Sequence, residues 1–170
     1  MKHTISVHVE DKPGALTRIT SMFARRGFNI DSLAVGPTER PGVSCITLRV
    51  DCSQHSLEQI EKQIHKLVNV LRVTEMVPGE SVERELMVLK VAIAPDRRTE
   101  LIGAAEAFRG RVLDIGAEAI VLELVGTPEE LDAFHELCRP HGIAELVRTG
   151  RVGMARASSR TTGRRLAAIN

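Results

Sequence analysis

The segment Asp11-Lys12-Pro13-Gly14-Ala15-Leu16 is the part of the sequence whose residue types and spacing best suit a chemical task. Gly14 carries no side chain at the point where a helix is expected to begin, so a ligand could closely approach the unpaired backbone N–H groups. Such amides, at the positive end of a helix dipole, bind carboxylates. A ligand that also carries an ammonium group needs an acceptor, which Asp11 or Asn29 could supply. The segment therefore suits a zwitterionic α-amino acid.

The same residues also fit a simpler interpretation. Pro13-Gly14 is a common turn pair, Asp11 could be only a cap, and Gly27-Phe28-Asn29 fits a helix exit without a binding role. The residue types alone favour this simpler interpretation.

The elements that position this segment follow from hydrophobic periodicity, and they occur in the same order twice. Alternating apolar residues predict strands, and apolar residues three or four apart predict helices. In the first half we expect strands at 5–9, 28–35, 43–50 and 70–77 and helices at 16–26 and 57–67. In the second half we expect strands at 85–94, 112–116, 119–126 and 143–149 and helices at 98–108 and 129–138.

Local signals indicate several boundaries. Arg25 and Arg26 followed by Gly27 form a cationic last turn and a C-cap. A loop with Pro37, Pro41 and Gly42 predicts that the strands on either side pair as an antiparallel hairpin. Ser53 or Ser56 opens the second helix. Thr127-Pro128-Glu129-Glu130 is a capping box with proline at the first helical position.

Each half therefore has the order βαββαβ, which predicts an α+β fold of two ferredoxin-like units, each an antiparallel sheet with two helices on one face. We expect the first unit at residues 1–78 and the second at 79–156. Residues 157–170 are basic, small and without pattern, and we interpret them as a disordered tail.

Composition excludes several classes of protein. The 23 basic and 22 acidic residues nearly balance, so no net field favours nucleic acid or an anionic membrane. The apolar runs are too short to span a bilayer, and the N-terminus lacks a signal-peptide pattern, so we expect a cytoplasmic protein without membrane contact. Cys45, Cys52 and Cys138 form no metal-binding spacing and are interpreted as ordinary thiols.

Association of two copies is expected from the strands of the central hairpin. Both carry apolar residues on both faces, which indicates that neither face of the sheet is fully exposed to water. A homodimer is the simplest arrangement that covers such a sheet. The alternative is that the two units of one chain pack their sheets together.

Neither an enzyme nor an RNA-binding protein fits the sequence well. His3, His8 and His65 are interpreted as solvent-facing, and the charge clusters 83–85 and 96–98 as solvated surface, so no catalytic or metal constellation is expected. RNA-binding modules of the same strand order stack bases on strand aromatics, whereas this chain has no Tyr or Trp and only Phe28 near a strand.

Several blocks resemble a known family. The segment 11–16 is followed by Arg25-Arg26-Gly27-Phe28-Asn29-Ile30-Asp31-Ser32-Leu33, and further blocks stand at 57–68, 82–86, 108–110 and 148–151. In this order they resemble the small subunits of acetolactate (acetohydroxyacid) synthase, whose N-terminal part is an ACT domain. The second block is more specific than the first, and the resemblance covers roughly residues 3–156.

This resemblance implies a function. It implies a non-catalytic regulatory subunit that dimerises through ACT domains, activates a separate catalytic large subunit and confers feedback inhibition by a branched-chain amino acid, usually valine, bound at the dimer interface. The second half is similar to the family's C-terminal domain. No cofactor is expected in this chain; thiamine diphosphate, magnesium and usually FAD belong to the catalytic subunit.

The resemblance also implies site residues. Asp11, Gly14 and Asn29 match the effector-binding positions, with the loop from one protomer and Asn29 from the other. The neighbouring positions of the matched blocks complete the expected site: Lys12, Pro13, Ala15, Leu16 and Ile30.

One departure from the family concerns Asp11, where many relatives carry asparagine. A carboxylate there favours an ammonium group but repels a ligand carboxylate, so the preference among valine, leucine and isoleucine stays open. The main alternative function is a free-standing amino-acid sensor that regulates transcription or another enzyme. The two differ in whether a thiamine-dependent synthase co-purifies with the chain.

Overall fold

The computed structural model describes residues 1–158 and divides into two compact units. The first comprises Met1–Glu83 together with the described residues from Arg151 to Ser158, and the second comprises Arg84–Gly150. The expected assignment of 79–156 to the second unit differs from this division at both of its ends. The expected tail falls almost entirely on 159–170, which lie outside the described residues.

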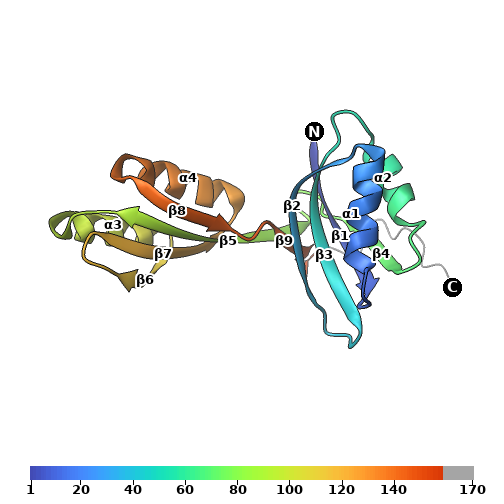
Figure 1. Cartoon of the computed structure of the whole chain (residues 1–170), viewed down its shortest axis with the longest axis horizontal. Coiled ribbons are helices and arrows are strands. Elements are labelled where there is room, and N and C mark those ends of the chain that lie inside the picture. Colours follow the sequence, from blue (N-terminus) through green and yellow to red (C-terminus); the bar gives the residue numbers. More distant parts are fainter. Residues whose placement is uncertain (159–170) are drawn as a thin grey trace. The chain divides into compact units, whose positions relative to one another are not determined.

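The first unit has the predicted βαββαβ order (Figure 1). Its sheet is antiparallel with strand order β2-β3-β1-β4, and both helices cover one face. The α+β fold predicted from the sequence is confirmed. The elements are β1 (Lys2–Glu10), α1 (Ala15–Arg26), β2 (Asn29–Pro37), β3 (Val43–Asp51), α2 (Leu57–Ile64) and β4 (Val70–Glu75).

Alternation in the strands and a 3.6-residue period in the helices bring the apolar side chains of this unit into one core. Ile5 and Val7 on β1 are fully buried, as are Leu48 on β3 and Ile60 on α2. On α1, Phe23 is 1% exposed and faces the same core. The core fixes which side of α1 faces the sheet and so which residues remain outside.

The register of the sheet shows which residues lie at each of its two ends. Glu10 at the end of β1 is opposite Val43, whereas Lys2 at its start is opposite Asp51. Strand β2 pairs with β3 from Asn29, which is opposite Asp51, to Pro37, which is opposite Ser44. Within residues 1–158, no strand pairs with the other side of β2. Therefore β2 is an edge strand that begins at the end of the sheet away from Glu10.

The termini of α1 agree with the sequence signals, but α2 is shorter than predicted. Gly27 caps α1 in a left-handed conformation after Arg25 and Arg26. Ser56 caps α2, which ends at Ile64 instead of continuing to 67. The reason is tertiary: the chain must turn after α2 so that β4 can pair with β1, and this pairing overrides the apolar helical pattern.

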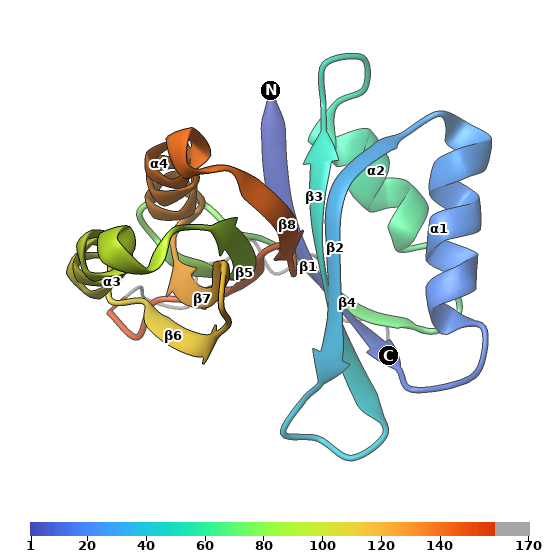
Figure 2. The same cartoon turned by 60° about the vertical axis from the view of Figure 1, so that its left-hand side comes forward.

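The second unit repeats the same order in an antiparallel sheet, with α3 and α4 packed on its core (Figure 2). The predicted capping box of α4 is confirmed: the Glu130 N–H donates to Thr127 Oγ1 at 3.3 Å, and the Thr127 N–H donates to Glu130 Oε2 at 2.7 Å. The elements are β5 (Ser81–Ala92), α3 (Arg98–Ala107), β6 (Arg111–Ile115), β7 (Ala119–Gly126), α4 (Pro128–Cys138) and β8 (Ile143–Arg148), with short 3-10 turns at Pro95–Arg97 and Arg139–His141.

The charged stretch 83–85 is not the solvated surface that the sequence suggested. Glu85 is 7% exposed and accepts two hydrogen bonds from Arg148. Glu83 accepts a hydrogen bond from Arg151 at 3.0 Å. These pairs let β5 begin at Ser81, earlier than predicted, because buried charge is tolerated when it is paired.

One strand was not predicted at all. Strand β9 (Val152–Ala155) pairs with β5, and within the first unit a Cβ on Gly153 would lie 3.4 Å from Cγ atoms of Met76 and Glu83. Four residues give too short a pattern to indicate a strand, so its partner decides its conformation. Among residues 1–158, no helix combines the length and apolar character needed to cross a bilayer.

Candidate functional site

The loop between β1 and α1 has a conformation that requires glycine. The Asp11 N–H donates to the Gly42 carbonyl at 2.8 Å, and the Ala15 N–H donates to the Lys12 carbonyl at 3.1 Å. Gly14 has a φ of 85°, a left-handed conformation that costs other L-residues about 1–2 kcal/mol. No atom lies within 4 Å of where its Cβ would stand. The backbone at Gly14 is therefore open to a ligand.

The first turn of α1 presents backbone N–H donors that the helix itself cannot pair. Gly14 is the N-cap, and within residues 1–158 no side chain caps this end and no acidic residue stands in the first turn. The amides of Leu16 and Thr17 therefore face outward at the positive end of the helix dipole, where they suit a carboxylate. Asp11 does not cap the helix, so that part of the simpler interpretation is wrong.

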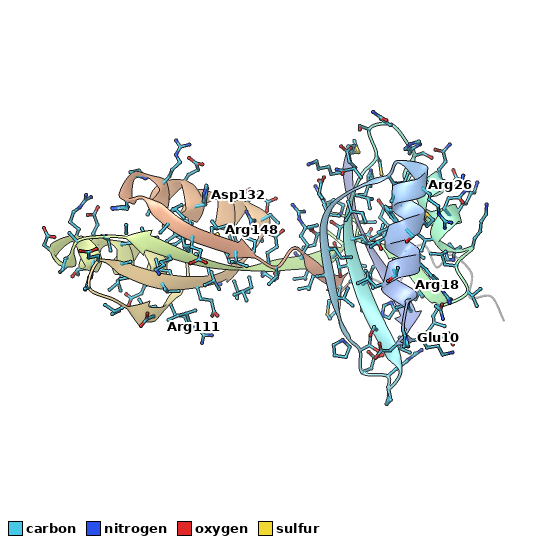
Figure 3. The ribbon with its side chains drawn as sticks, viewed as in Figure 1. Glu10, Arg18, Arg26, Arg111, Asp132 and Arg148 are labelled. Atoms are coloured by element: carbon cyan, nitrogen blue, oxygen red, sulfur yellow. The ribbon has the colours of Figure 1, made fainter. Side chains whose placement is uncertain are left out.

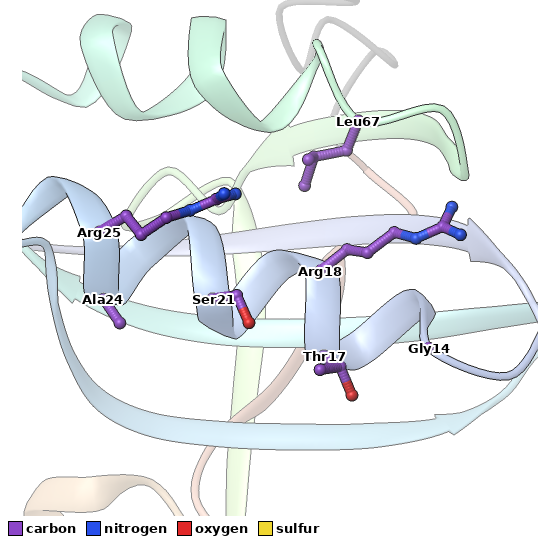
Figure 4. Close-up of a pocket in the computed structure, with 7 residues that line it drawn as sticks. All are labelled: Gly14, Thr17, Arg18, Ser21, Ala24, Arg25 and Leu67. Atoms are coloured by element: carbon purple, nitrogen blue, oxygen red, sulfur yellow. The ribbon is translucent and has the colours of Figure 1, made fainter.

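A groove of about 840 Å³ extends along α1 from this helix start. Figure 4 shows Gly14 at one end of the groove, with Arg18 on the turn that follows. All of the lining residues except Leu67 are exposed. The groove is lined by Gly14, Thr17, Arg18, Ser21, Ala24, Arg25 and Leu67.

The predicted loop residues differ in accessibility. Asp11, Lys12 and Pro13 are exposed, Ala15 is 7% exposed and packs in the core, and Leu16 is 37% exposed. Asp11 and Leu16 can therefore reach a ligand, whereas the Ala15 side chain serves the fold.

Asn29 and Ile30 lie far from the loop of their own chain. The helix between them and Gly14 has 12 residues, which corresponds to about 18 Å. Along the sheet, Asn29 is level with Lys2, because both are opposite Asp51, and the loop follows Glu10. The eight residue steps from Lys2 to Glu10 correspond to about 27 Å. One chain does not bring these two parts of the predicted site together.

Asn29 is available for binding at its own end of the sheet. It is exposed, and its Nδ2 donates to Asp31 Oδ1 at 3.0 Å. This bond orients the amide and leaves the Asn29 carbonyl oxygen as a possible acceptor. Ile30 is half-buried and packs against the core, so its side chain serves the fold.

Charges around the loop are arranged in pairs. Lys12 Nζ lies 3.0 Å from Glu10 Oε2, which also accepts a hydrogen bond from Asn69 Nδ2 at 2.9 Å. Lys12 and then Asn69 lower the pKa of the Glu10 carboxyl below its ordinary value of 4.5. Because Lys12 is tied to Glu10, the guanidinium of Arg18 is the cation next to Gly14 in the groove.

The histidines are less exposed than the sequence suggested. His3 is half-buried, and its Nδ1 lies 2.8 Å from Glu75 Oε1. His8 and His65 are half-buried too, and burial, followed by Arg72, lowers the pKa of His8. Among residues 1–158, no group of three or more His, Cys, Asp or Glu side chains could hold a metal ion.

Of the remaining candidates for chemistry, Cys138, Cys52 and Phe28 pack in or against the cores. The thiol of Cys45 instead lies 3.2 Å from Ser6 Oγ. Cys138 is fully buried, and burial raises the pKa of its thiol to about 11. Cys45 and Cys52 are free and half-buried. Phe28 makes edge-on ring contacts with Phe23 at 5.6 Å between centroids. A ring held in this way is unlike the exposed stacking platforms of RNA-binding sheets.

Comparison with known proteins agrees with both units. A family described as the AHAS small subunit-like ACT domain matches residues 5–72, and one described as the small subunit of acetolactate synthase matches residues 84–157. An acetolactate synthase small subunit from Mycolicibacterium smegmatis is 46% identical over 154 residues, which are 91% of this chain and 91% of that protein. This chain belongs to the acetolactate synthase small-subunit family.

Other relatives extend this result. A probable acetolactate synthase small subunit from Archaeoglobus fulgidus is 42% identical over 94% of this chain and 100% of its own length. The crystal structure of the acetolactate synthase small subunit from Thermotoga maritima has a TM-score of 0.84 and 39% identity, and the match covers 92% of this chain and 98% of that chain. The family resemblance seen in the sequence is confirmed.

The family matches follow the structural units of this small subunit. The ACT-domain match, at 5–72, lies within the first unit and contains the loop, α1 and Asn29. The second match begins at Arg84, the first residue of the second unit. The candidate effector site of this family member therefore lies wholly in its ACT domain.

The residues that support the loop of this ACT domain were not predicted from the sequence. Arg18, Thr17 and Ser21 line the groove with Gly14, and Asn69 contacts both flanks of the loop. The spacing 14, 17, 18 and 21 is that of one helical face, so periodicity could have indicated the first three. Asn69 had no such signal, since it follows α2 in a turn.

Proposed function

We propose that this chain is the regulatory subunit of an acetolactate synthase, and that it binds valine or a similar branched-chain amino acid at a site shared by two copies. In this proposal the bound amino acid controls a separate catalytic subunit and inhibits it when the product accumulates. The observation that carries the proposal is the position of Gly14 and Asn29 at opposite ends of α1.

The edge strand β2 supports the shared site. If two copies pair β2 with β2 in antiparallel fashion around Leu33, the middle residue of the strand, Asn29 of the partner subunit comes opposite Pro37. Pro37 pairs with Ser44 on β3, and on its other side Ser44 pairs with Val9 on β1. Val9 lies two residues before the loop. A two-fold axis therefore brings each loop to the Asn29 end of the other copy.

Exposed apolar surface on β2 favours such pairing. Val35 is 49% exposed although it lies within strand β2. An edge strand of nine residues with unpaired backbone groups readily adds another strand. Two identical edges form a closed pair, which accounts for a dimer instead of an open chain of copies.

The chemistry at the proposed site fits both ends of the ligand. The amides after Gly14 would bind the carboxylate, and Asp11 or the carbonyl oxygen of Asn29 would accept from the ammonium. The half-exposed Leu16 offers apolar contact for the ligand side chain. Burial of a valine side chain contributes about 1.5–3 kcal/mol, and each charge-assisted hydrogen bond contributes a similar amount. Affinity in the range of about micromolar to millimolar is expected.

Inhibition requires that the ligand bind one arrangement of the dimer more tightly than another. A ligand held between two copies can do this, because its contacts depend on how the copies are placed. In this proposal the chain itself is not catalytic and carries no cofactor. Thiamine diphosphate, magnesium and FAD would be held by the catalytic subunit, which condenses 2-oxo acids.

A complementation experiment tests the shared site. Gly14→Asp and Asn29→Ala homodimers, each with weakened valine binding, are mixed and allowed to exchange subunits, and calorimetry measures valine binding. A mixed dimer combines the intact loop of the Asn29→Ala chain with the intact Asn29 of the Gly14→Asp chain, so one site of wild-type affinity should return. If both halves of the site came from one chain, mixing would restore none.

A second experiment tests the regulatory role against the alternative of a free-standing sensor. The tagged chain is expressed with the acetolactate synthase catalytic subunit of the same organism, purified, and assayed with and without valine. We expect co-purification, higher synthase activity and inhibition by valine. A chain that neither retains the catalytic subunit nor changes its activity would instead be a free-standing sensor.

A further inference from the structure

Asn69 is a buried polar residue in the turn between α2 and β4. It is 8% exposed, and it is one of six polar or charged residues buried to this degree within residues 1–158. A buried amide is costly unless its hydrogen-bonding groups are satisfied. The partners of Asn69 therefore indicate why asparagine stands there.

Those partners lie on both flanks of the loop 11–14. The backbone carbonyl of Asn69 accepts from the Glu10 N–H at 2.9 Å, and its Nδ2 donates to Glu10 Oε2 at 2.9 Å. Its Oδ1 accepts from Nη1 of Arg18, one turn into α1. Figure 3 shows Glu10 and Arg18 at the same end of α1, with Arg26 at the other end.

The two side-chain bonds require an amide. Glu10 as a carboxylate only accepts, and Arg18 only donates, so the residue between them must donate on one side and accept on the other. Aspartate would accept from Arg18 but repel Glu10, and leucine would satisfy neither. Among side chains of this length, only asparagine meets both demands.

We propose that Asn69 is the positioning residue of the effector loop: it ties the last residue of β1 to the first turns of α1 and so sets the spacing between Asp11 and the amides that follow Gly14. This inference rests on the proposed function, because it assigns Asn69 to the same site. Asn69 does not line the groove and acts through Glu10 and Arg18.

Ordering the loop before the ligand arrives should raise affinity. A loop fixed in its binding conformation loses less conformational entropy when the ligand binds. Asn69 holds Glu10 and Arg18 by three hydrogen bonds, so the loop 11–14 between them has little freedom to move. Arg18 is also fixed beside Gly14, where its charge adds to the positive end of the helix dipole.

A swap of donor and acceptor tests this role. Asn69→Asp places a carboxylate against Glu10, and we expect hydrogen exchange at residues 11–17 to become faster and the dissociation constant for valine to rise on the order of tenfold. Glu10→Gln alone should have little effect, because the glutamine oxygen still accepts from Asn69. In the double variant the glutamine amide introduced by Glu10→Gln can donate to the new carboxylate, so both readouts should return toward wild type.

Gln63→Glu is the matched control, because it adds the same charge on the nearby end of α2 without facing Glu10. It should leave both readouts unchanged while the variants remain dimeric and folded. The inference is overturned if Asn69→Asp exchanges and binds like wild type, or if the double variant is no better than Asn69→Asp. If the wild type binds no valine, the proposed function fails, and hydrogen exchange still decides whether Asn69 orders the loop.

Discussion

Gly14 and Asn29 lie beyond opposite ends of the 12-residue helix α1, although the family resemblance assigns both to one ligand. The separation is set by the fold, because β1, α1 and β2 must run the length of the sheet in turn. A ligand that contacts both residues therefore has to lie between two chains. The geometry of one chain therefore favours the two-copy site proposed above.

Substitution of Gly14 separates backbone strain from ligand binding. Gly14 and Gly79 have the same φ of 85°, and neither has an atom within 4 Å of an added Cβ. Gly14→Asp and Gly79→Asp should therefore each lower the free energy of unfolding by about 1 kcal/mol. Only Gly14→Asp places an anion beside the carboxylate site, so only it should abolish valine inhibition of the reconstituted synthase. If valine inhibited the two variants equally, the loop would not be part of the effector site.

The sequence was sufficient for most of the fold because most of its signals are local. The alternation in β1, the cationic end of α1 and the capping box at Thr127 each specify an element within a few residues. Strand β9 shows the limit of such reasoning, since its four residues become a strand only when β5 is present to pair with them.

The candidate site was predictable only in part for the same reason. Glycine at a helix start is a local signal, so Gly14 could be predicted from residue types together with the family resemblance. Asn69, which supports the loop, has only distant side-chain partners: it is 59 positions from Glu10 and 51 from Arg18. A single sequence gives no measure of such distant pairs, whereas the fold brings them into contact.

Asn29→Ala should weaken valine binding without abolishing it. It removes one acceptor for the ammonium group, a charge-assisted hydrogen bond worth about 1.5–3 kcal/mol, so the dissociation constant should rise by roughly 13- to 160-fold. Calorimetry with the dimeric variant measures this change. Gln59→Ala, on the exposed side of α2, serves as the control and should bind like wild type. A loss of binding as complete as in Gly14→Asp would mean that Asn29 does more than donate or accept one bond.

The titration of Glu10 reports on the flank of the loop. Its pKa is lowered in the folded protein, so the ionised carboxylate stabilises the fold above pH 4.5, and this contribution is lost as the pH falls below 4.5 through the folded pKa. Lys12 is the larger cause and Asn69 the second. Carbon-detected NMR titration should therefore show a greater rise of the Glu10 pKa in Lys12→Met than in Asn69→Ala. Lys62→Met, which removes a lysine paired with Glu58, should leave it unchanged.

A pair of glycines in the second unit tests whether effector binding is confined to the ACT domain. A Cβ at Gly110 would lie 2.8 Å from Leu124 Cγ and 3.0 Å from the Glu123 carbonyl oxygen, whereas Gly103 in α3 has open space around it. Gly110→Ala should therefore lower the free energy of unfolding by about 1–3 kcal/mol because the backbone of β7 must shift, and Gly103→Ala should raise it by about 0.5–1 kcal/mol. Thermal unfolding measures both changes. Below the melting temperature of either variant, valine should bind with wild-type affinity, because every residue of the proposed site lies in the first unit. Weaker binding of valine to Gly110→Ala would show that the second unit helps to set the effector site.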